Sequence, residues 1–532
     1  MSKSEKVSGN WQRICKLDDL IPNVGACARV AGFQVALFRV AENEVCAIGN
    51  YDPNCGANVL SRGLVGDLDG RLVVASPIYK QHFDLKTGEC IEEPVASVKS
   101  WQVRLADGWV EVGHAGEIAA RKPRLVVVGN GMAAMRVVEE VLRVAPDLYD
   151  ITVFGAEQHG NYNRIQLSPV LAGEKKVDEI MLNTPDWYAR HGIALHLGDE
   201  VVKIDRSRRL VRAASGYETR YDRLLLATGS NPVIIPVPGK ELPGVVTFRD
   251  LRDVDAMLAA AREHKRAVVI GGGLLGLEAA NGLLRQGMSV KVVHLLDSLM
   301  ERQLDKRAGE MLQASLEAHG VEFLMSMQTE AILGDERVTG VRFKDGSEVE
   351  ADLVVMAVGI RPNISLAKSA GLRCERGVIV DDTLQTYDPR IYAVGECVQH
   401  RDATYGLVAP LWEQANVCAA HLAQMGFARY AGSVTSTRLK VTGIDLFSAG
   451  DFSGGEGSED LVLHDHARKI YKRLVLKDQR IVGVVLFGDV SDGPWYFELM
   501  QQGVNVTALR QTLLFGKDAS KREQAKGRKQ AS

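Results

Sequence analysis

The stretch LVVVGNGMAAMRVVEEVL, residues 125–142, decides the fold. Its first four residues are apolar and predict a buried strand, and the spacing of the apolar residues after the glycines predicts a helix. Gly129, Gly131 and Ala134 lie between these two elements at the spacing G-x-G-x-x-A. In this context glycine lets the backbone approach a pyrophosphate, and the helix N-terminus stabilises its negative charge. The stretch therefore predicts a Rossmann-like dinucleotide-binding domain.

The same strand–turn–helix pattern occurs a second time in VVIGGGLLGLEAANGLL, residues 268–284. Gly271, Gly273 and Gly276 have the full G-x-G-x-x-G spacing after another apolar strand. A single glycine-rich turn could serve only the close packing of a helix on a strand. Two copies favour two bound dinucleotides, and hydride transfer between a nicotinamide and a flavin is the simplest chemistry that uses both.

Composition and charge exclude several other classes of protein. The 532 residues are 46% hydrophobic and 25% charged with a net charge of -3, which is typical of globular proteins and leaves no basic domain for nucleic acid. No uncharged apolar run approaches the about 20 residues of a membrane helix, and the N-terminus has no apolar signal sequence. The eight cysteines include no Cys-x-x-Cys pair. We therefore expect a cytoplasmic protein without a disulfide scaffold.

The pattern along the chain predicts several domains. Short β-rich runs with Asp-Gly turns indicate an all-β domain before a proline-containing joint near residue 120. Strands then alternate with helices, which indicates an α/β fold with two Rossmann-like, three-layer domains. We expect an all-β domain at 1–120, a first dinucleotide-binding domain at 123–240 and 350–428, a second at 241–349, a small α+β interface domain at 433–516, and a disordered basic tail at 517–532.

Two further strands end in small residues, one before Ala227-Thr228-Gly229 and one before Gly395-Glu396. With the glycine turns, these motifs resemble the pyridine nucleotide-disulfide oxidoreductase superfamily, in which the first site holds FAD and the second holds NAD(P)H. The resemblance implies that Glu396, in place of the usual aspartate, contacts the ribityl chain and pyrophosphate. The implied FAD contacts are Gly129, Gly131, Met132, Ala133, Ala134, Glu157, Arg164, Ser168, Ala227, Thr228, Gly229, Gly395 and Glu396, and the implied NAD(P)H contacts are Gly271, Gly273 and Gly276.

The segment after the second strand of the first domain carries charged candidates. Glu157 lies where an acid commonly hydrogen-bonds a ribose hydroxyl. The stretch EQHGNYNRIQLSPVLAG, residues 157–173, has no Cys-x4-Cys, so electrons must leave the flavin without a dithiol relay. It resembles the Tyr-x-Arg-x-x-Leu-Ser segment of rubredoxin-reductase-like and nitrite-reductase flavoproteins. Arg164 could offer a fork of donors to a phosphate or to the flavin ring, or form a surface ion pair, and Ser168 is expected to cap the next turn.

Glu278 is a second candidate catalytic residue beside Arg164. It follows the second set of glycines by one helical turn. The resemblance implies a carboxylate close to the nicotinamide and the flavin, and the alternative is a buried capping acid.

Selectivity for the nicotinamide cofactor depends on the end of the next strand. His294 stands where the ribose-binding acid is expected, Asp297 follows three residues later, and no arginine cluster for a 2'-phosphate precedes Arg302. The sequence favours NADH over NADPH.

Three longer segments are similar to the flavoprotein part of assimilatory NAD(P)H nitrite reductase. They are Val292 to Asp305, Tyr392 to Ala415 and Ser436 to Asp451. The resemblance implies electron transfer from NADH through FAD to a metal centre on a partner, a sirohaem nitrite reductase or a molybdenum nitrate reductase component. The family's cysteine-rich and sirohaem half is not expected here. The alternatives are a reductase for a ferredoxin, a rubredoxin or an oxygenase component, and a flavin-based redox sensor or docking protein.

Residues 1–120 resemble the small, Rieske-like subunit of the same nitrite reductase. A Rieske cluster needs Cys-x-His and a later Cys-x-x-His. The corresponding positions are Asp52, Asn54, Ser76 and Tyr79, none of which is such a ligand. We therefore expect the fold without the cluster, and a use in covering the flavin entrance or docking the acceptor.

No other metal site is expected. Cys55 and His82 lie near the cluster positions at the wrong spacing and are expected to be core or loop residues. His464 and His466 have the spacing of a metal pair, but no third ligand type clusters with them, which favours an exposed loop.

Overall fold

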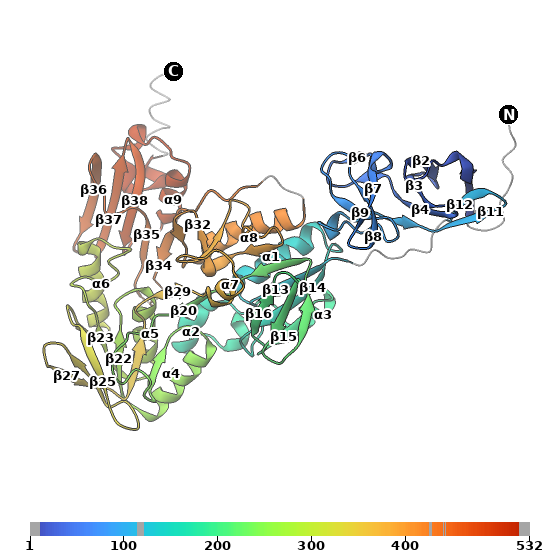
Figure 1. The fold of residues 1–532 in the computed structure, drawn as a ribbon. Helices are drawn as coiled ribbons and strands as arrows, with labels where there is room; N and C mark the ends of the chain where they lie inside the picture. Colours follow the sequence, from blue (N-terminus) through green and yellow to red (C-terminus); the bar gives the residue numbers. More distant parts are fainter. Residues whose placement is uncertain (1–10, 114–121, 425–427, 440, 442, 521–532) are drawn as a thin grey trace, which may run out of the picture.

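The computed structural model describes residues 11–113, 122–424, 428–439, 441 and 443–520. Figure 1 shows an N-terminal β-domain projecting from one side of a central α/β body, with a C-terminal domain at the opposite end. The predicted fold class is confirmed, since two parallel sheets with covering helices form the central body. No described helix is long and apolar enough to cross a membrane.

The first dinucleotide-binding domain contains a five-stranded parallel sheet in the order β15-β14-β13-β19-β31. Its strands are β13 (Arg124–Val128), β14 (Asp150–Gly155), β15 (Ala194–Leu197), β19 (Arg223–Leu226) and β31 (Ile391–Ala393). Helix α1 (Met132–Val144) packs against α8 (Val408–Leu422). Because β31 comes from late in the chain, this domain is discontinuous in sequence, and the second domain is inserted between β19 and β31.

The second dinucleotide-binding domain repeats this plan in the order β21-β28-β22-β23-β24. Its elements are β21 (Val245–Thr247), α4 (Leu251–Glu263), β22 (Arg266–Ile270), α5 (Leu274–Arg285), β23 (Ser289–Val293), α6 (Lys306–Ala318), β24 (Glu322–Leu324) and β28 (Leu353–Met356). Each domain also carries a three-stranded antiparallel sheet, β16 (Val201–Asp205), β17 (Leu210–Ala213) and β18 (Glu218–Arg220) in the first, and β25 (Thr329–Leu333), β26 (Gly340–Phe343) and β27 (Glu348–Glu350) in the second.

A strand pair and a helix pair bring the dinucleotide-binding domains together. The outgoing strand β20 (Ser230–Pro232) pairs antiparallel with the returning strand β29 (Ile360–Pro362). Helix α2 (Leu167–Leu171) of the first domain packs on α5 of the second so closely that a Cβ at Gly282 would lie 2.6 Å from Leu171. The carboxyl edges of the two sheets are thereby held at one interface.

The C-terminal domain is an antiparallel sheet that packs on the second dinucleotide-binding domain. The sheet order is β34-β35-β38-β37-β36, with bounds β34 (Ser436–Arg438), β35 (Leu446–Gly450), β36 (Ser458–Asp465), β37 (Ile470–Lys477) and β38 (Arg480–Phe487), followed by α9 (Gly493–Gln501). Leu446, Tyr471 and Phe487 share one core with Leu299 and Leu304.

The predicted tail at 517–532 begins too early. Residues 517–520 form a helical turn, in which the Lys517 amide donates to Asp492 at 3.0 Å and Ser520 is buried. Residues 521–532 lie outside the described part of the chain.

The N-terminal domain is built from small antiparallel sheets. They are β1 (Trp11–Lys16), β12 (Trp109–Gly113) and β11 (Val103–Ala106); β10 (Ser100–Trp101), β4 (Glu44–Gly49), β3 (Phe33–Ala41) and β2 (Gly25–Val30); β7 (Leu64–Leu68), β8 (Arg71–Ala75) and β9 (His82–Asp84); and β5 (Tyr51–Asp52) with β6 (Ala57–Asn58). At the predicted ligand positions, the buried Ser76 hydroxyl donates to the buried Asp52 carboxylate at 2.5 Å. This hydrogen bond joins the two loops that a cluster would otherwise connect.

The N-terminal domain contacts the first dinucleotide-binding domain at the amino ends of its strands. Arg223, the buried first residue of β19, pairs with Glu93 at 2.6 Å, and Arg390, just before β31, donates to the Glu92 carbonyl at 2.9 Å. Val95 packs against the hydrophobic core of the first dinucleotide-binding domain. Dinucleotides bind at the carboxyl ends of such strands. The expectation that the domain covers the flavin entrance is therefore wrong.

The N-terminal domain should contain no iron. Asp52 and Ser76 are hydrogen-bonded to each other where two cluster ligands would stand, so thiolate and imidazole ligands are missing from those positions. Metal analysis and electron paramagnetic resonance of the reduced protein should find no [2Fe-2S] centre. A stoichiometric signal would show that Asp52, Asn54, Ser76 and Tyr79 do not correspond to the cluster ligands.

Candidate active site

The glycines of the first turn have different physical tasks. Gly129 has φ +112°, and a Cβ there would lie 2.2 Å from the Ala227 carbonyl oxygen, so glycine is needed for the strand ends to meet. A Cβ at Gly131 would meet no heavy atom within 4 Å. Ala134 is fully buried against the sheet. The turn thus leaves a space above Gly131 that fits a pyrophosphate.

The second turn divides the tasks in the same way. Gly271 has φ +125° and lies against the Ala357 carbonyl, and a Cβ at Gly276 would lie 1.9 Å from the Gly271 carbonyl oxygen. A Cβ at Gly273 would again meet nothing within 4 Å. Gly131 and Gly273, which stand at the third position of their motifs, face open space, while Gly129, Gly271 and Gly276 lie against backbone carbonyls. Both turns therefore fit a dinucleotide rather than close packing alone.

The carboxyl edge of the first sheet gathers the other predicted cofactor-binding motifs. Gly395 directly follows β31 with φ +90°, and its amide donates to the buried Gln414 side chain at 2.8 Å. A Cβ at Gly395 would lie 3.0 Å from Ala133, which is buried with Met132 at the start of α1. The Thr228 hydroxyl donates to the Asn363 carbonyl at 2.7 Å. These motifs therefore line one edge, as a single FAD site requires.

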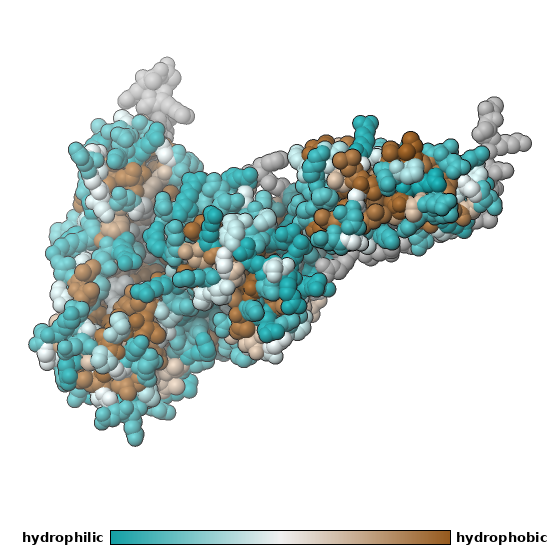
Figure 2. Space-filling model, in the orientation of Figure 1, coloured by the Kyte–Doolittle hydropathy of each residue, from teal (hydrophilic) through white to brown (hydrophobic). Residues whose placement is uncertain are grey.

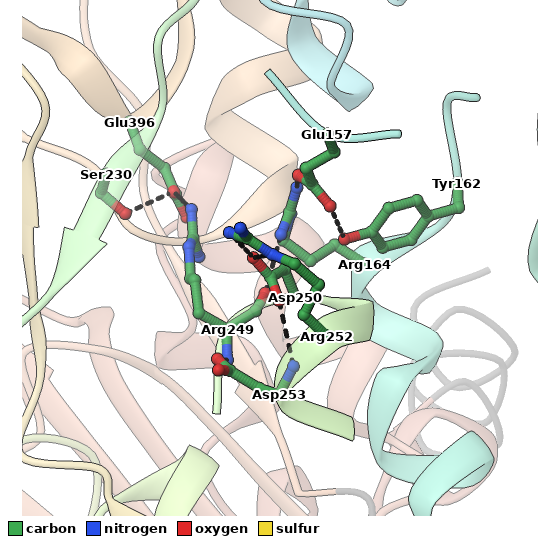
Figure 3. Close-up of polar contacts among 9 residues, drawn as sticks. All are labelled: Glu157, Tyr162, Arg164, Ser230, Arg249, Asp250, Arg252, Asp253 and Glu396. Atoms are coloured by element: carbon green, nitrogen blue, oxygen red, sulfur yellow. Dashed lines mark hydrogen bonds and ion pairs between the residues drawn. The ribbon is translucent and has the colours of Figure 1, made fainter. Parts of the chain in front are cut away.

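The predicted residues Glu157 and Arg164 come together (Figure 3). Glu157 accepts from Arg164 at 2.5 Å and from the Tyr162 hydroxyl at 2.6 Å, and Arg164 also donates to the Arg249 carbonyl at 2.7 Å. Burial raises the pKa of Tyr162, so its hydroxyl stays a donor. Of the alternatives for Arg164, the structure shows an ion pair, which places a partly buried guanidinium beside the edge that binds the cofactor.

Arg249 is a residue that the sequence did not single out. It follows β21 of the second domain and crosses to Glu396 of the first, which also accepts from the Ser230 hydroxyl at 2.7 Å. A Cβ at Gly229 would lie 3.7 Å from the Arg249 guanidinium. The only local signal is an arginine shortly before the Asp250 N-cap of α4, and nothing in the sequence indicates its partner.

Ser168 and Glu278 join the two dinucleotide-binding domains. The Ser168 hydroxyl on α2 donates to the Glu278 carboxylate on α5, and both residues are buried. The prediction that Ser168 caps the next turn is wrong, because Ser168 lies inside α2 and its hydroxyl donates to Glu278, while the side-chain cap in this segment is Asn163 on the preceding 3-10 turn, Arg164–Gln166. Glu278 lies inside α5 and caps neither end. Its catalytic role stays a prediction.

Cysteine chemistry does not connect the two sites. Burial raises the pKa of Cys397 and of Cys418, so both stay protonated. The Cys397 thiol donates to the Val394 carbonyl at 3.3 Å. Electrons that reach a bound flavin have no thiolate pair to pass through in the described chain.

The other metal-type residues have ordinary partners. Cys55 contacts the Asp52 carbonyl, and His82 hydrogen-bonds Glu92 at 2.6 Å. His464 lies at the end of β36 rather than in a loop, and its ring is tilted by 30° against that of His466 with centroids 3.6 Å apart. Within the described ranges, no three potential ligand side chains gather around one point.

Replacing Gly131 by valine should remove FAD but spare the fold. The added side chain enters the open space above the turn, and the backbone there is extended, so the protein itself is not strained. FAD content, measured by absorbance, should fall at least about tenfold, since the side chain excludes the pyrophosphate. The matched variant Gly273→Val should keep FAD and lose NAD(P)H binding. Retention of FAD in Gly131→Val would place the cofactor elsewhere.

Comparison with known proteins agrees with this geometry. Residues 123–425 match the family model of the pyridine nucleotide-disulphide oxidoreductases, residues 10–113 that of the Rieske-like [2Fe-2S] domain, and residues 436–504 that of the rubredoxin NAD+ reductase C-terminal domain. The solved putidaredoxin reductase–putidaredoxin complex is similar with a TM-score of 0.65 and 27% identity, over 72% of this chain and 92% of that chain.

Two curated relatives come from Bacillus subtilis. Nitrite reductase [NAD(P)H] is 53% identical over 73% of this chain and 48% of its own length. The assimilatory nitrate reductase electron transfer subunit is 46% identical over 70% of this chain and 48% of its own length. The chain thus matches about half the length of these relatives. With two glycine turns that fit FAD and NAD(P)H, and a family match across its central body, this chain belongs to the pyridine nucleotide-disulphide oxidoreductase family.

Proposed function

We propose that this chain is the electron-transfer component of assimilatory nitrite or nitrate reduction in the cytoplasm, taking electrons from NADH and delivering them to a partner protein. The observation that carries the proposal is the direct interface of the two dinucleotide sites, bridged by Ser168 and Glu278 without a thiol pair. When bound, FAD supplies a centre that accepts a hydride from NAD(P)H and releases electrons one at a time.

The chain's own residues bind and orient the two dinucleotides. The open spaces above Gly131 and Gly273 receive the pyrophosphates, and the helix N-termini of α1 and α5 stabilise their charge. Arg164 and Arg249 add positive charge beside the first site, each held by a carboxylate. Because both guanidinium groups are partly buried and paired, they are fixed before the cofactor arrives.

The names of the relatives support a protein acceptor with a metal centre. One relative is a nitrite reductase, and another is an electron transfer subunit of nitrate reductase. A sirohaem nitrite reductase or a molybdenum nitrate reductase component is the proposed acceptor. The likeness to putidaredoxin reductase favours a second candidate, a reductase for a separate iron–sulfur protein.

The N-terminal domain is proposed to dock the acceptor. Tyr51, Leu64, Ile78 and Tyr79, beside the former ligand loops, expose between 50% and 76% of their surface. Figure 2 shows apolar side chains gathered on the N-terminal domain among hydrophilic ones. Exposed apolar groups of this kind commonly mark protein contacts. Rapid dye reduction by NADH, followed by electron delivery to each purified candidate acceptor, tests the proposed function.

NADH should be the better substrate. No arginine cluster lies beside Val293, where a 2'-phosphate would need one. Comparison of kcat/KM for the two nucleotides at equal ionic strength checks this. A ratio that favours NADPH by more than about tenfold, or about 1.4 kcal/mol, would mean that another residue recognises the phosphate.

Deletion of residues 1–120 should separate the two activities. FAD content and NADH-dependent dye reduction should change less than about twofold, because both glycine turns follow Arg124. The rate of electron delivery to the protein acceptor should fall at least about tenfold, because the acceptor is no longer held at a high effective concentration. Glu93→Gln is the matched control, since it weakens the contact with Arg223 but keeps the domain. Equal loss of both activities would indicate a structural role, and no loss would exclude docking.

A further inference from the structure

His294 occupies the position at which Rossmann folds commonly place the acid that binds the nucleotide ribose. It directly follows β23, the second strand of the domain that carries Gly271 and Gly273. Its side chain is only 10% exposed, so it points into the protein rather than along the open edge. This residue therefore does something other than hydrogen-bond a ribose.

Both ring nitrogens of His294 are engaged. Nδ1 lies 3.1 Å from the amide nitrogen of Gly272, and Nε2 lies 3.0 Å from the Ser298 carbonyl oxygen and 3.3 Å from the Glu301 carboxylate. A backbone N–H can only donate, so Nδ1 must accept and Nε2 must carry the proton that it donates. The partners thus fix the tautomer and the orientation of the ring.

The ring contacts the centre of the glycine turn. Gly272 lies between the tight-turn glycine and the glycine that faces open space, and its hypothetical Cβ would lie 2.7 Å from the His294 ring. The Gly272 carbonyl accepts from the Met300 amide at 3.0 Å. His294 and Met300 therefore hold both backbone groups of Gly272, one from each side.

Nearby side chains do not replace the missing acid. Leu295 and Leu296 are exposed apolar residues. The Asp297 side chain is 71% exposed and pairs with Lys306 at 3.2 Å. The charged group closest to His294 in these contacts is Glu301, which lies on the Nε2 side of the ring.

We propose that His294 is a positioning residue of the second site: it holds Gly272, and through it the glycine turn, in the shape that receives the nucleotide pyrophosphate, and it does not recognise the ribose. The proposal rests on the assignment of this site to NAD(P)H. Pyrophosphate and adenine are common to NADH and NADPH, so the loss of His294 must weaken both nucleotides by the same factor.

Three variants of the full-length, FAD-loaded protein test this role. His294→Leu removes the acceptor for Gly272, His294→Asn keeps an acceptor close to the place of Nδ1, and His319→Leu makes the same change at an exposed histidine of the same domain. Dissociation constants for NAD+ and NADP+ are measured by calorimetric titration, with FAD content and Tm recorded for each variant.

We expect His294→Leu to raise both dissociation constants about tenfold, because a buried N–H loses its partner and the turn loses its fixed shape. His294→Asn should restore both to within about threefold of the wild type, and His319→Leu should match the wild type.

Three results would overturn the proposal. An NAD+ to NADP+ affinity ratio that shifts more than about tenfold in His294→Leu would show that the residue recognises the ribose. Unchanged affinities would show that the turn keeps its shape without the ring. A fall in FAD content and Tm that His294→Asn does not restore would show a role in the fold alone. Acceptor activity does not enter the test, so failure of the proposed acceptor leaves these outcomes intact.

Discussion

The close approach of two strand ends at each glycine turn is the constraint on which the rest of the structure depends. Gly129 lies against the carbonyl of Ala227, and Gly271 lies against that of Ala357, at distances that exclude any side chain. Because neighbouring parallel strands end together there, their amide groups and helix N-termini converge on one edge. The binding edges, the packing of α1 and α5, and the separation of strand and helix layers all follow from this contact.

The two edges become one active site only through contacts between the domains. Ser168 and Glu278 join α2 to α5, and Arg249 joins the second domain to Glu396 of the first. Each contact uses a charged or polar group that is buried or partly buried, so its loss would leave an unsatisfied group at the interface. The polar bridges thus specify how the domains sit, while the apolar packing of Leu171 on Gly282 supplies the close approach.

Local patterns predicted those parts of the site that depend on backbone geometry. The glycine turns could be found because their spacing follows from the strand–turn–helix unit, whereas the ribose contact of Glu157 stays a prediction. The partners of Ser168 and Arg249 could not be found, because each lies on an element more than 100 residues away in the chain, and a residue type gives no indication of its long-range partner. The contact of His294 with Gly272 could not either, because it depends on how the ring turns at the end of β23. Ser168 illustrates the error: serine is a common capping residue, but here it is the second residue of α2 and its hydroxyl donates across the domain interface to Glu278.

The place of the N-terminal domain limits what it can do for electron transfer. It pairs with Arg223, the first residue of β19, whereas the cofactor edge follows Leu226, the last residue of that strand. At about 3.3 Å per residue, the strand alone separates the two edges by about 10 Å. A domain at the amino edge does not cover a flavin bound at the carboxyl edge of the same sheet. The proposed docking role therefore requires an acceptor that contacts this domain and also reaches the opposite edge of the sheet.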